Sequence, residues 1–475
     1  MRKTLLLTLI AVIVLSLALT GCNTDNGGDN TTTTNSSDIT TPTSDGTTTP
    51  TGEDNVITPD SSGVTTPITN DTTDPDEEYN KKASKGLEFM SNGDGTCYVS
   101  GLGTCTDTDI IIPKTSPEGD KVTEIGLLHN CKDITSVIIP DSVMRIGYYA
   151  FKDCTGLTSI TIPDSVTSIG NFAFSGCTAV KDLHISSIEA WLKADILSHP
   201  FGSSRSTEKN LYINGRIVTE INIPNDFTSI GNDAFAGCTG LTSVTIPDSV
   251  TSIGKYAFYG CSAMKELHIS SVEAWCKVDL RDYYSHPFYS STATDQNIYI
   301  NGEKITNLVI PETITSIGAH AFENCTGLTS ITIPDSVTSI GDGAFYGCTG
   351  LTSIVIPDSV TSIGSKVFFY CTDLTSIEIP DSVKSIGDYA FYYCTGLTSI
   401  VIPDSVKSIG DVAFYGCSGL KTVYYGGTAS DWSNNISIGS SNTALTDAIR
   451  YYYSDTEPTS SGNYWHYVNG VPTAW

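Results

Sequence analysis

Apolar and polar residues alternate in short runs that recur along most of the chain. In residues 154–176, CTGLTSITIPDSVTSIGNFAFSG, the apolar Leu157, Ile160 and Ile162 are separated by threonine and serine. Residues two apart in a β-strand point to the same side, so Ile160 and Ile162 predict a short strand with one buried face. Pro163 lacks a backbone N–H and ends this strand, and the Pro-Asp-Ser sequence favours a turn.

The second half of the same stretch predicts how the chain turns back. Val166 and Ile169 predict a second short extended segment, and Ala173, Phe174 and Cys177 predict a short helical turn that closes one coil. Burial of an apolar side chain contributes roughly 1.5–3 kcal/mol. Ordering the backbone costs roughly 1–2 kcal/mol per residue. A single coil therefore cannot fold alone and needs its neighbours.

Ile-Pro pairs show the period of this pattern. Their prolines are residues 113, 140, 163, 224, 247, 311, 334, 357, 380 and 403. Most successive prolines are 23 residues apart, and the two long intervals follow Pro163 (61 residues) and Pro247 (64 residues). Tandem repeats of this length indicate a solenoid in which neighbouring strands lie ~4.8 Å apart.

The repeat resembles that of the BspA-like leucine-rich-repeat proteins of bacterial surfaces. The shared features are the L-x-x-L-x-L strand, the IPxSVxxIGxxAFxxC sequence and the 23-residue period, over about residues 84–475. The resemblance implies a right-handed leucine-rich-repeat array of mostly short parallel β-strands, with turns and short helical segments. It also implies protein binding or adhesion at a cell surface. The solenoid proper is predicted over residues 131–417.

The two long intervals carry inserts that are copies of each other, at about residues 180–220 and 264–307. They read HISSIEAWLKAD and HISSVEAWCKVD, and each continues to SHPF and an Asn-Gly pair. Both contain the capping-box sequence S-x-x-E, at Ser186–Glu189 and Ser270–Glu273, which predicts a short helix. The Asn-Gly pairs, at 214–215 and 301–302, favour β-hairpins. Each insert is predicted as a helix and a hairpin that bulge from one edge of the solenoid.

The two ends of the repeat array are predicted to be caps, which solenoids need to cover their terminal coils. Residues 84–130 form the N-terminal cap and first coil, with SNGDG (91–95) as a hairpin turn. Residues 418–475 form the C-terminal cap, because Thr428-x-x-Asp431-Trp432 and Asn469-Gly470 repeat the helix and hairpin signals of the inserts.

The N-terminus has the features of an export signal. Arg2 and Lys3 precede an apolar run from Leu5 to Leu19. The sequence then reads Leu-Thr-Gly-Cys, which resembles the lipobox of bacterial lipoproteins. The resemblance implies a signal peptide at residues 1–21, a lipid on Cys22 and an extracytoplasmic protein that is lipid-anchored at the bacterial cell surface. An ordinary cleaved signal or a short membrane helix is the alternative.

Composition separates the N-terminal segment from the repeats. Residues 23–80 are mostly Thr, Ser, Asp, Asn, Gly and Pro, so residues 22–80 are predicted to be a lipidated cysteine followed by a disordered stalk. The whole chain has a formal net charge of −27. This charge argues against nucleic-acid binding and against docking on anionic lipid, both of which need basic patches. The lipid anchor is the only membrane contact predicted.

The cysteines recur at one position of the repeat. Ten of them are residues 131, 154, 177, 238, 261, 325, 348, 371, 394 and 417, and Cys105 is predicted as an eleventh. Parallel side chains ~4.8 Å apart are wider than the ~3.8 Å that a disulfide prefers. One thiol per coil also does not converge on a metal ion. We therefore expect a ladder of buried free thiols, with Cys97 and Cys276 outside it as candidate surface thiols, although disulfides and metal binding stay open.

Other residue types offer little sign of catalysis. Histidines recur in the inserts (His184 with His199, His268 with His286) without further metal ligands in a fixed pattern, so a structural role is expected. An aspartate follows most Ile-Pro pairs, which leaves open a column of calcium sites or, more simply, turn residues. The sequence contains no G-x-S-x-G, H-E-x-x-H or P-loop motif. The chain is predicted not to be an enzyme and no cofactor is predicted.

The position after the Phe of the Ala-Phe pair is aromatic in the last four copies. The candidate partner-binding residues are Tyr259, Tyr346, Phe369, Tyr392 and Tyr415, to which the insert tryptophans Trp191 and Trp275 are added. Exposed contiguous aromatic residues mark binding surfaces. A non-enzymatic surface protein that binds a host or bacterial protein is the first hypothesis. A carbohydrate-binding lipoprotein and a passive spacer are the alternatives, and both the aromatic residues and the tryptophans could equally serve packing.

Overall fold

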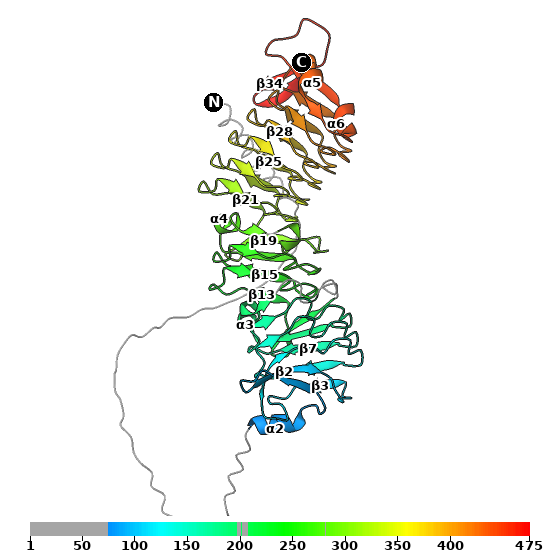
Figure 1. The fold of residues 1–475 in the computed structure, drawn as a ribbon. Coiled ribbons are helices and arrows are strands. Elements are labelled where there is room, and N and C mark those ends of the chain that lie inside the picture. Colours follow the sequence, from blue (N-terminus) through cyan, green and yellow to red (C-terminus); the bar gives the residue numbers. More distant parts are fainter. Residues whose placement is uncertain (1–74, 197–200, 202–207, 281) are drawn as a thin grey trace, which may run out of the picture. The chain divides into compact units, whose positions relative to one another are not determined.

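The computed structural model describes residues 75–196, 201, 208–280 and 282–475. The predicted signal peptide, Cys22 and the stalk up to residue 74 lie outside these residues. Residues 75–475 form a parallel β-solenoid whose coils are stacked in chain order from helix α2 (Pro75–Lys82) to strand β34 (Tyr464–Val468) (Figure 1). In the described part of the chain, no helix is long and apolar enough to cross a membrane. The last residues of the predicted stalk, 75–80, belong to α2.

Each coil contributes one strand to each of two sheets. In the coil that starts at residue 154, the first strand is β7 (Ser159–Ile162) and the second is β8 (Ser168–Ile169). Ile160 and Ile162 are buried and Thr161 between them is exposed, as the alternation predicts. Ile160 pairs with Val137 of the preceding coil and with Leu183 of the following one. We call the sheet of first strands face A and the sheet of second strands face B.

Face A consists of four ladders of hydrogen-bonded strands. The first holds β3 (Asp109–Ile111), β5 (Ser136–Ile138), β7, β9 (Asp182–Ile185), β11 (Asn210–Ile213) and β12 (Arg216–Ile217). The second holds β13 (Glu220–Asn222), β15 (Ser243–Ile246), β17 (Glu266–Ile269), β19 (Asn297–Ile300) and β20 (Glu303–Ile305). The third holds β21 (Asn307–Val309), β23 (Ser330–Thr332) and β25 (Ser353–Val355), and the fourth holds β27 (Ser376–Glu378), β29 (Ser399–Ile402), β31 (Thr422–Tyr425), β33 (Ile449–Tyr453), β34 and β35 (Val471–Ala474).

Face B is built from shorter strands and is interrupted at the same coils. Its first ladder holds β1 (Glu88–Ser91), β2 (Thr96–Gly101), β4 (Lys121–Ile125), β6 (Arg145–Ile146), β8 and β10 (Asp195–Ile196), and its second holds β14 (Ser229–Ile230), β16 (Ser252–Ile253) and β18 (Asp279–Leu280). The others hold β22 (Ser316–Ile317) with β24 (Ser339–Ile340), and β26 (Ser362–Ile363), β28 (Ser385–Ile386), β30 (Ser408–Ile409) and β32 (Ser437–Ile438).

The Ala-Phe segment forms the third side of each coil, which we call the turn edge. Ala173 N–H donates to Gly170 O and Cys177 N–H donates to Phe174 O, so the hydrogen bonds span three residues. The segment is therefore a series of turns, and the predicted helical turn is wrong. The reason is that alternate N–H groups are used between coils, as when Phe151 N–H donates to Ala173 O at 2.7 Å. A helix would need those donors for its own carbonyls.

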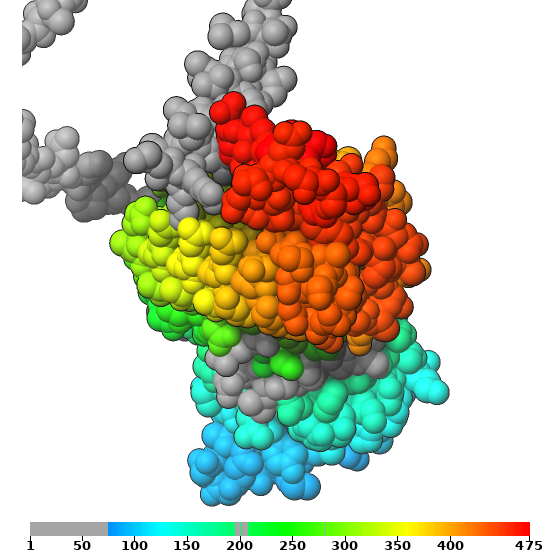
Figure 2. All heavy atoms as spheres, turned by 90° about the horizontal axis from the view of Figure 1, so that it is seen from above, coloured from blue at the N-terminus to red at the C-terminus, as the bar shows by residue number. Residues whose placement is uncertain are grey.

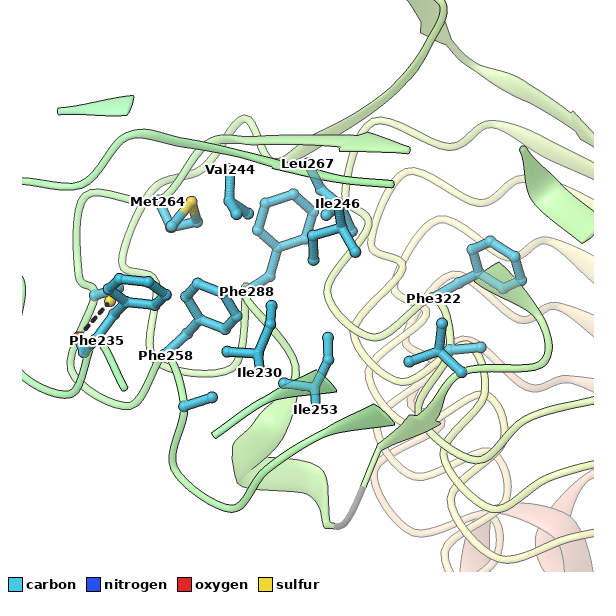
Figure 3. Close-up of a cluster of buried hydrophobic side chains, with 14 of the residues drawn as sticks. Ile230, Phe235, Val244, Ile246, Ile253, Phe258, Met264, Leu267, Phe288 and Phe322 are labelled. Carbon is cyan, nitrogen blue, oxygen red and sulfur yellow. Dashed lines mark hydrogen bonds between the residues drawn. The ribbon is translucent and has the colours of Figure 1, made fainter. Parts of the chain in front are cut away.

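Apolar side chains from all three sides fill the interior of the coils. The phenylalanines of the Ala-Phe pairs stack in columns, with ring centroids 5.4 Å apart for Phe151 and Phe174 and 5.0 Å apart for Phe391 and Phe414. In Figure 3, Phe235, Phe258 and Phe288 occupy successive places in this column and face isoleucines of the two sheets. Repeating one sequence thus places like side chains on one another in successive coils.

The inserts are integrated into the stack, which corrects the prediction that they bulge from an edge. Strand β9 of the first insert pairs with β7 in the same register as an ordinary coil, and Leu183 and Ile185 are buried. Phe201 of the SHPF sequence stacks on Phe174 at 5.4 Å, and so takes the place of an Ala-Phe phenylalanine. The second insert is alike, since Phe288 is fully buried. In the described residues, each insert therefore supplies a face A strand, a face B strand and a turn-edge phenylalanine, with a helix in place of the Pro-Asp-Ser corner.

The helices and hairpins of the inserts are present. Helix α3 (Ile188–Lys193) and helix α4 (Val272–Trp275) begin one residue later than the capping-box pattern indicates, because Ser187 and Ser271 accept the capping N–H groups. The hairpin turns lie at the two Asn-Gly pairs, where Asn214 and Asn301 have positive φ.

The two insert hairpins divide the solenoid into three blocks. Both faces are interrupted after each hairpin, which leaves block 1 (75–217), block 2 (220–305) and block 3 (307–475). A further interruption, between β25 and β27 and between β24 and β26, lies inside block 3 and has no insert.

The predicted terminal elements are also present. SNGDG joins the antiparallel strands β1 and β2 at the N-terminal end. At the C-terminal end, Thr428 and Asp431 form a capping box at helix α5 (Ala429–Asn435), which is followed by helix α6 (Thr443–Asp447). The hairpin of β34 and β35 turns at Asn469-Gly470.

The insert tryptophans join neighbouring blocks. Trp191 donates its indole N–H to Ala234 O at 2.9 Å, from block 1 to block 2. Trp275 donates to Ala321 O at 2.6 Å, from block 2 to block 3. Each side chain is only 3% exposed. A buried carbonyl without a donor is costly, so these bonds are expected to stabilise the junctions, where the strand ladders of both faces are interrupted.

We predict that Trp275→Phe lowers the free energy of unfolding by about 2–4 kcal/mol. The change removes the indole donor of the buried Ala321 carbonyl and opens a small cavity. Urea unfolding of the full chain measures the effect. Trp475→Phe is the control, because the Trp475 side chain is 47% exposed although it also donates to a backbone carbonyl. Equal, small losses for the two variants would contradict a stabilising role for Trp275 at the junction.

Candidate binding surface on the turn edge

Four of the predicted aromatic residues form a continuous ring stack on the turn edge of block 3. The ring centroids are 4.6 Å apart for Tyr346 and Phe369, 4.5 Å for Phe369 and Tyr392, and 5.4 Å for Tyr392 and Tyr415. The ring planes differ by 8–15°. We call Tyr346, Phe369, Tyr392 and Tyr415 the stripe. The predicted stack is present, and its role in binding stays a prediction.

Three further tyrosines widen the stripe. Tyr370 directly follows Phe369, and Tyr393 directly follows Tyr392. Tyr389 lies three residues before Tyr392. Tyr370 lies edge-on to Phe369, with centroids 4.8 Å apart, and Tyr389 lies 5.7 Å from Tyr392. These three rings are absent from the residues that the repeat pattern predicts. The signal for two of them is the pair of adjacent aromatic residues in FFYC and FYYC.

All three flanking tyrosines, Tyr389 with φ 57° included, occupy a backbone conformation that favours glycine. Tyr370 has φ 58° and Tyr393 has φ 54°. At the position of Tyr370 and Tyr393, five other copies have glycine, with φ 68–80°, and three have Asn or Asp, with φ 55–60°. The glycines are Gly176, Gly237, Gly260, Gly347 and Gly416. A left-handed conformation costs an L-residue roughly 1–2 kcal/mol, and such residues cluster at functional sites.

A glycine on the next coil makes room for one of these rings. A Cβ atom on Gly416 would lie 2.6 Å from a carbon of the Tyr393 ring, so only glycine leaves space there. The Tyr393 ring also lies 5.4 Å from that of Tyr370. Both rings are therefore displayed at the surface by a backbone that glycine would adopt at lower cost.

A second aromatic cluster lies on the turn edge of block 2. The predicted Tyr259 stacks on Tyr289 with centroids 6.3 Å apart, and Tyr284 lies 4.9 Å from Tyr289. Tyr283 and Tyr284 come from the 3₁₀ helix η2 (Tyr283–Ser285) of the insert. Tyr289 follows Phe288 as Tyr259 follows Phe258, so the insert coil continues the stripe position. Tyr289 could be predicted from the sequence SHPFY if SHPF were recognised as the equivalent of an Ala-Phe segment.

A buried carboxyl group separates the two clusters. Glu323 occupies the stripe position in the first coil of block 3, and only 2% of its side chain is exposed. His320 Nδ1 lies 2.8 Å from Glu323 Oε2. Burial raises the pKa of Glu323, and the contact with His320 opposes this shift. Burial also raises the pKa of Tyr346 to about 12, with a smaller contribution from the charge of Glu323.

The two predicted tryptophans do not belong to this surface. Trp191 and Trp275 are buried at the block junctions, where their indole groups bond to backbone carbonyls. A buried ring has no face to offer a ligand. The prediction that they bind a partner is therefore corrected, and packing, the alternative for these residues, is what the structure shows.

Nine of the ten repeated cysteines form the predicted ladder of buried thiols, whereas Cys131 and Cys105, at its N-terminal end, are only partly buried. In most coils, the thiol donates to a backbone carbonyl of the preceding coil, as from Cys348 to Phe322 O at 3.1 Å and from Cys394 to Phe368 O at 3.0 Å. All cysteines in the described part of the chain are free. Cys97 and Cys276 are buried, which corrects their prediction as surface thiols. Burial raises the pKa of Cys348 to about 12, so its thiol is neutral at pH 7.

The described insert histidines have structural surroundings. His184 stacks on Tyr212 at 4.5 Å and His268 stacks on Tyr299 at 4.6 Å. Burial lowers the pKa of His286 to about 3, while His199 lies outside the described residues. Among the described residues, no group of three or more His, Cys, Asp or Glu side chains could hold a metal ion.

Two open hollows of about 330–340 Å³ lie beside the insert helices. The larger is lined by Asp248, Ser271, Glu273 and Lys277, among others. These groups bond to each other, since Ser271 donates to Asp248 at 3.0 Å and Lys277 pairs with Glu273 at 2.9 Å. The polar side chains named here already have partners within the protein, so the aromatic surface is the better candidate for binding.

Comparison with known proteins agrees with the repeat geometry. A family model described as a BspA type leucine rich repeat region matches six copies, over residues 123–194, 205–277 and 292–423. The crystal structure of a leucine rich cell surface protein from Faecalibacterium prausnitzii A2-165 is 30% identical, with a TM-score of 0.52, and the match covers 74% of this chain and 96% of that one.

Two further crystal structures of leucine-rich repeat proteins are similar to this chain. The one from Bacteroides ovatus ATCC 8483 is 28% identical, and the match covers 75% of this chain and 98% of that one, with a TM-score of 0.44. The one from Eubacterium ventriosum ATCC 27560 is 22% identical and covers 72% and 83%, with a TM-score of 0.41. No curated protein matches the chain.

We predict that the double variant Tyr370→Gly, Tyr393→Gly keeps the free energy of unfolding within about 1 kcal/mol of the parent. Relief of the left-handed backbone is expected to offset the ring contacts that are lost. Urea unfolding of the full chain measures this. Phe368→Ala, in the buried column of the same coil as Tyr370, is the destabilising comparison and should cost about 3–5 kcal/mol. A double variant as unstable as Phe368→Ala would assign the two tyrosines to packing.

Proposed function

The chain belongs to the family of BspA-type leucine-rich-repeat proteins, and we propose that it is a non-enzymatic cell-surface lipoprotein that binds a protein through the aromatic surface of block 3. The family match and the related structure from F. prausnitzii, which is a cell surface protein, support the surface location. The aromatic surface comprises the stripe with Tyr370, Tyr389 and Tyr393.

The observation that carries this proposal is the display of tyrosines at positions where the fold favours glycine. Tyr370 is 40% exposed at φ 58°, and the half-buried Tyr393 has φ 54°. A core residue would gain contacts in return for this strain, whereas these rings remain partly open to solvent. Strain that the fold does not need is expected where a surface serves binding.

The orientation of the rings favours a protein over a glycan as the partner. Inner rings of the stripe are covered on both faces by their neighbours at 4.5–5.4 Å. A sugar packs its apolar face on an open ring face, which these rings do not offer. A protein can instead contact ring edges and tyrosine hydroxyl groups, and Tyr beside Ser and Gly is typical of protein-binding loops. Burial of Trp191 and Trp275 removes the other candidate sugar platforms.

The anchor is a separate part of the proposal. Cys22 follows Leu-Thr-Gly after an apolar run, and it lies outside the described residues. A lipid there would hold the solenoid at the membrane by its N-terminal end, because attached acyl chains anchor proteins stably when two or more are present. Residues 23–74 would then separate the membrane from α2.

We predict that the full chain binds one or more proteins of an extracellular-protein and glycan array saturably. The triple variant Tyr370→Gly, Tyr393→Gly, Tyr415→Ala should weaken that binding about 100-fold, since exposed aromatic residues are frequent hot spots. The array and a titration by surface plasmon resonance measure both effects.

Tyr148→Ala is the matched control for this binding test. Tyr148 is 51% exposed, lies in block 1 and is remote in sequence from the stripe. Protein binding that resists the triple variant would reject the aromatic surface as the site. Saturable glycan binding that the triple variant abolishes would favour the carbohydrate alternative. No binding to any protein or glycan of the array would favour a passive spacer.

We predict that Cys22→Ser releases the protein from the membrane fraction of its host cells and abolishes incorporation of labelled fatty acid. The reason is that the thiol is the only acceptor for the lipid in the lipobox-like sequence. Cell fractionation and metabolic labelling measure the two effects. Cys105→Ser, which alters a half-exposed thiol of the solenoid, should leave both unchanged. Membrane retention of Cys22→Ser would point to the uncleaved apolar segment as the anchor.

A further inference from the structure

The aromatic surface of block 3 lies in the most acidic part of the solenoid. Residues 307–475 contain fifteen acidic and five basic residues, a net charge of −10. On the turn edge between residues 340 and 418, the acidic residues are Asp342, Asp373, Asp388 and Asp411, all exposed, and the basic residue is Lys366. Figure 2 shows the coils between residues 340 and 418, yellow to orange, next to one another as one continuous surface.

Three of these carboxylates are held in a fixed row by the fold. One oxygen of Asp342 accepts the N–H of Ser365 at 2.8 Å, and one oxygen of Asp388 accepts the N–H of Asp411 at 2.8 Å. Asp411 accepts the N–H of Ser440 at 2.6 Å. Each of these aspartates lies at the start of the turn edge of its coil. Its Oδ1 atom accepts a backbone hydrogen bond from the following coil.

The negative charge is not needed for this structural bond. In block 2 the same position is Asn232, whose side-chain oxygen accepts the N–H of Lys255 at 2.8 Å. A neutral amide therefore makes the bridge equally well. The charge of Asp342, Asp388 and Asp411 exceeds the structural need, and it lies beside the tyrosines of the proposed binding surface.

The turn edge already holds ammonium groups of the chain itself on tyrosine rings. Lys152 Nζ lies 4.8 Å from the centroid of the Tyr149 ring and 3.9 Å from a carboxylate oxygen of Asp153. Lys366 Nζ lies 6.0 Å from the centroid of the Tyr283 ring. An ammonium over an aromatic face is attracted by the negative charge of that face.

In block 3, the coil of Tyr389 offers this arrangement without a lysine at the stripe position. Tyr389 occupies the repeat position of Tyr149, is 37% exposed and directly follows Asp388. The coil of Tyr149 has Lys152 at the stripe position, whereas the coil of Tyr389 has Tyr392 there. The ring plane of Tyr389 is tilted 54° from that of Tyr392, so these rings are not stacked face to face.

We propose that the protein partner presents a basic segment to this surface, with Lys or Arg side chains over Tyr389 and against the row of Asp342, Asp388 and Asp411. This inference rests on the proposed function and names the partner's chemistry. Charge complementarity of this kind chooses partners and speeds their association, while the tyrosines supply contact area.

The test measures binding of the full chain to three matched Gly-Ser peptides whose variable positions are all Lys, all Glu or all Gln, at about 0.15 M salt. The Lys peptide should bind, and the other two should not. The triple variant Asp342→Asn, Asp388→Asn, Asp411→Asn should weaken binding of the Lys peptide about tenfold, because the amides keep the backbone bonds and remove the charge. Tyr389→Leu should weaken it about threefold or more, and Tyr389→Phe should retain most of it.

The control triple variant is Asp358→Asn, Asp381→Asn, Asp404→Asn. It removes the same charge from the corner between face A and face B, where these aspartates are also exposed. Equal weakening by the two triple variants would show unspecific attraction to an acidic protein and overturn the inference. So would failure of the Lys peptide to bind, or tighter binding of the Glu or Gln peptide.

The outcomes for the inference and for the proposed function are distinct. An array protein whose binding needs Tyr370, Tyr393 and Tyr415 but resists the Asp342, Asp388, Asp411 variant would leave the proposed function standing and overturn the basic partner. Lys-peptide binding that follows the predicted pattern, with no array protein bound through the tyrosines, would reject the proposed function alone.

Discussion

Hydrogen bonding between successive coils is the constraint on which this structure depends. A coil has no partner for its strand N–H and C=O groups except the coil before and the coil after it, and an unpaired buried backbone group is costly. Pairing in register then stacks each residue on its counterpart, as Ile160 does between Val137 and Leu183. The phenylalanine columns, the thiol ladder and the stripe are consequences of this one register.

The register explains why so much of the fold follows from the sequence. Strand positions, the hairpins at Asn-Gly pairs and the buried thiols depend on local patterns that recur, and they are found where the period predicts them. The turn edge is different, because apolar spacing at Ala173, Phe174 and Cys177 suits a helix as well as a chain of turns. What decides is whether the N–H groups bond within the coil or to the next one, and side-chain patterns do not encode that choice.

The same limit applies to the site. The stack of Tyr346, Phe369, Tyr392 and Tyr415 is predictable because it repeats one position, whereas Tyr289 is hidden in an insert whose SHPF sequence does not look like Ala-Phe. Trp191 looks like an exposed platform on a short helix. Its burial depends on a carbonyl 43 residues away, which no local pattern indicates.

The positions most informative about function are those where block 3 has a residue that the backbone of the repeat does not require. The fold accepts glycine at 370 and 393 and an amide at 342, 388 and 411, since other coils use these residues for the same backbone task. Block 3 instead has tyrosine and aspartate there, at a cost in backbone strain and in charge repulsion. Because the stacking constraint is satisfied without them, these substitutions are best explained by something outside the chain, and a basic protein segment meets both the rings and the carboxylates.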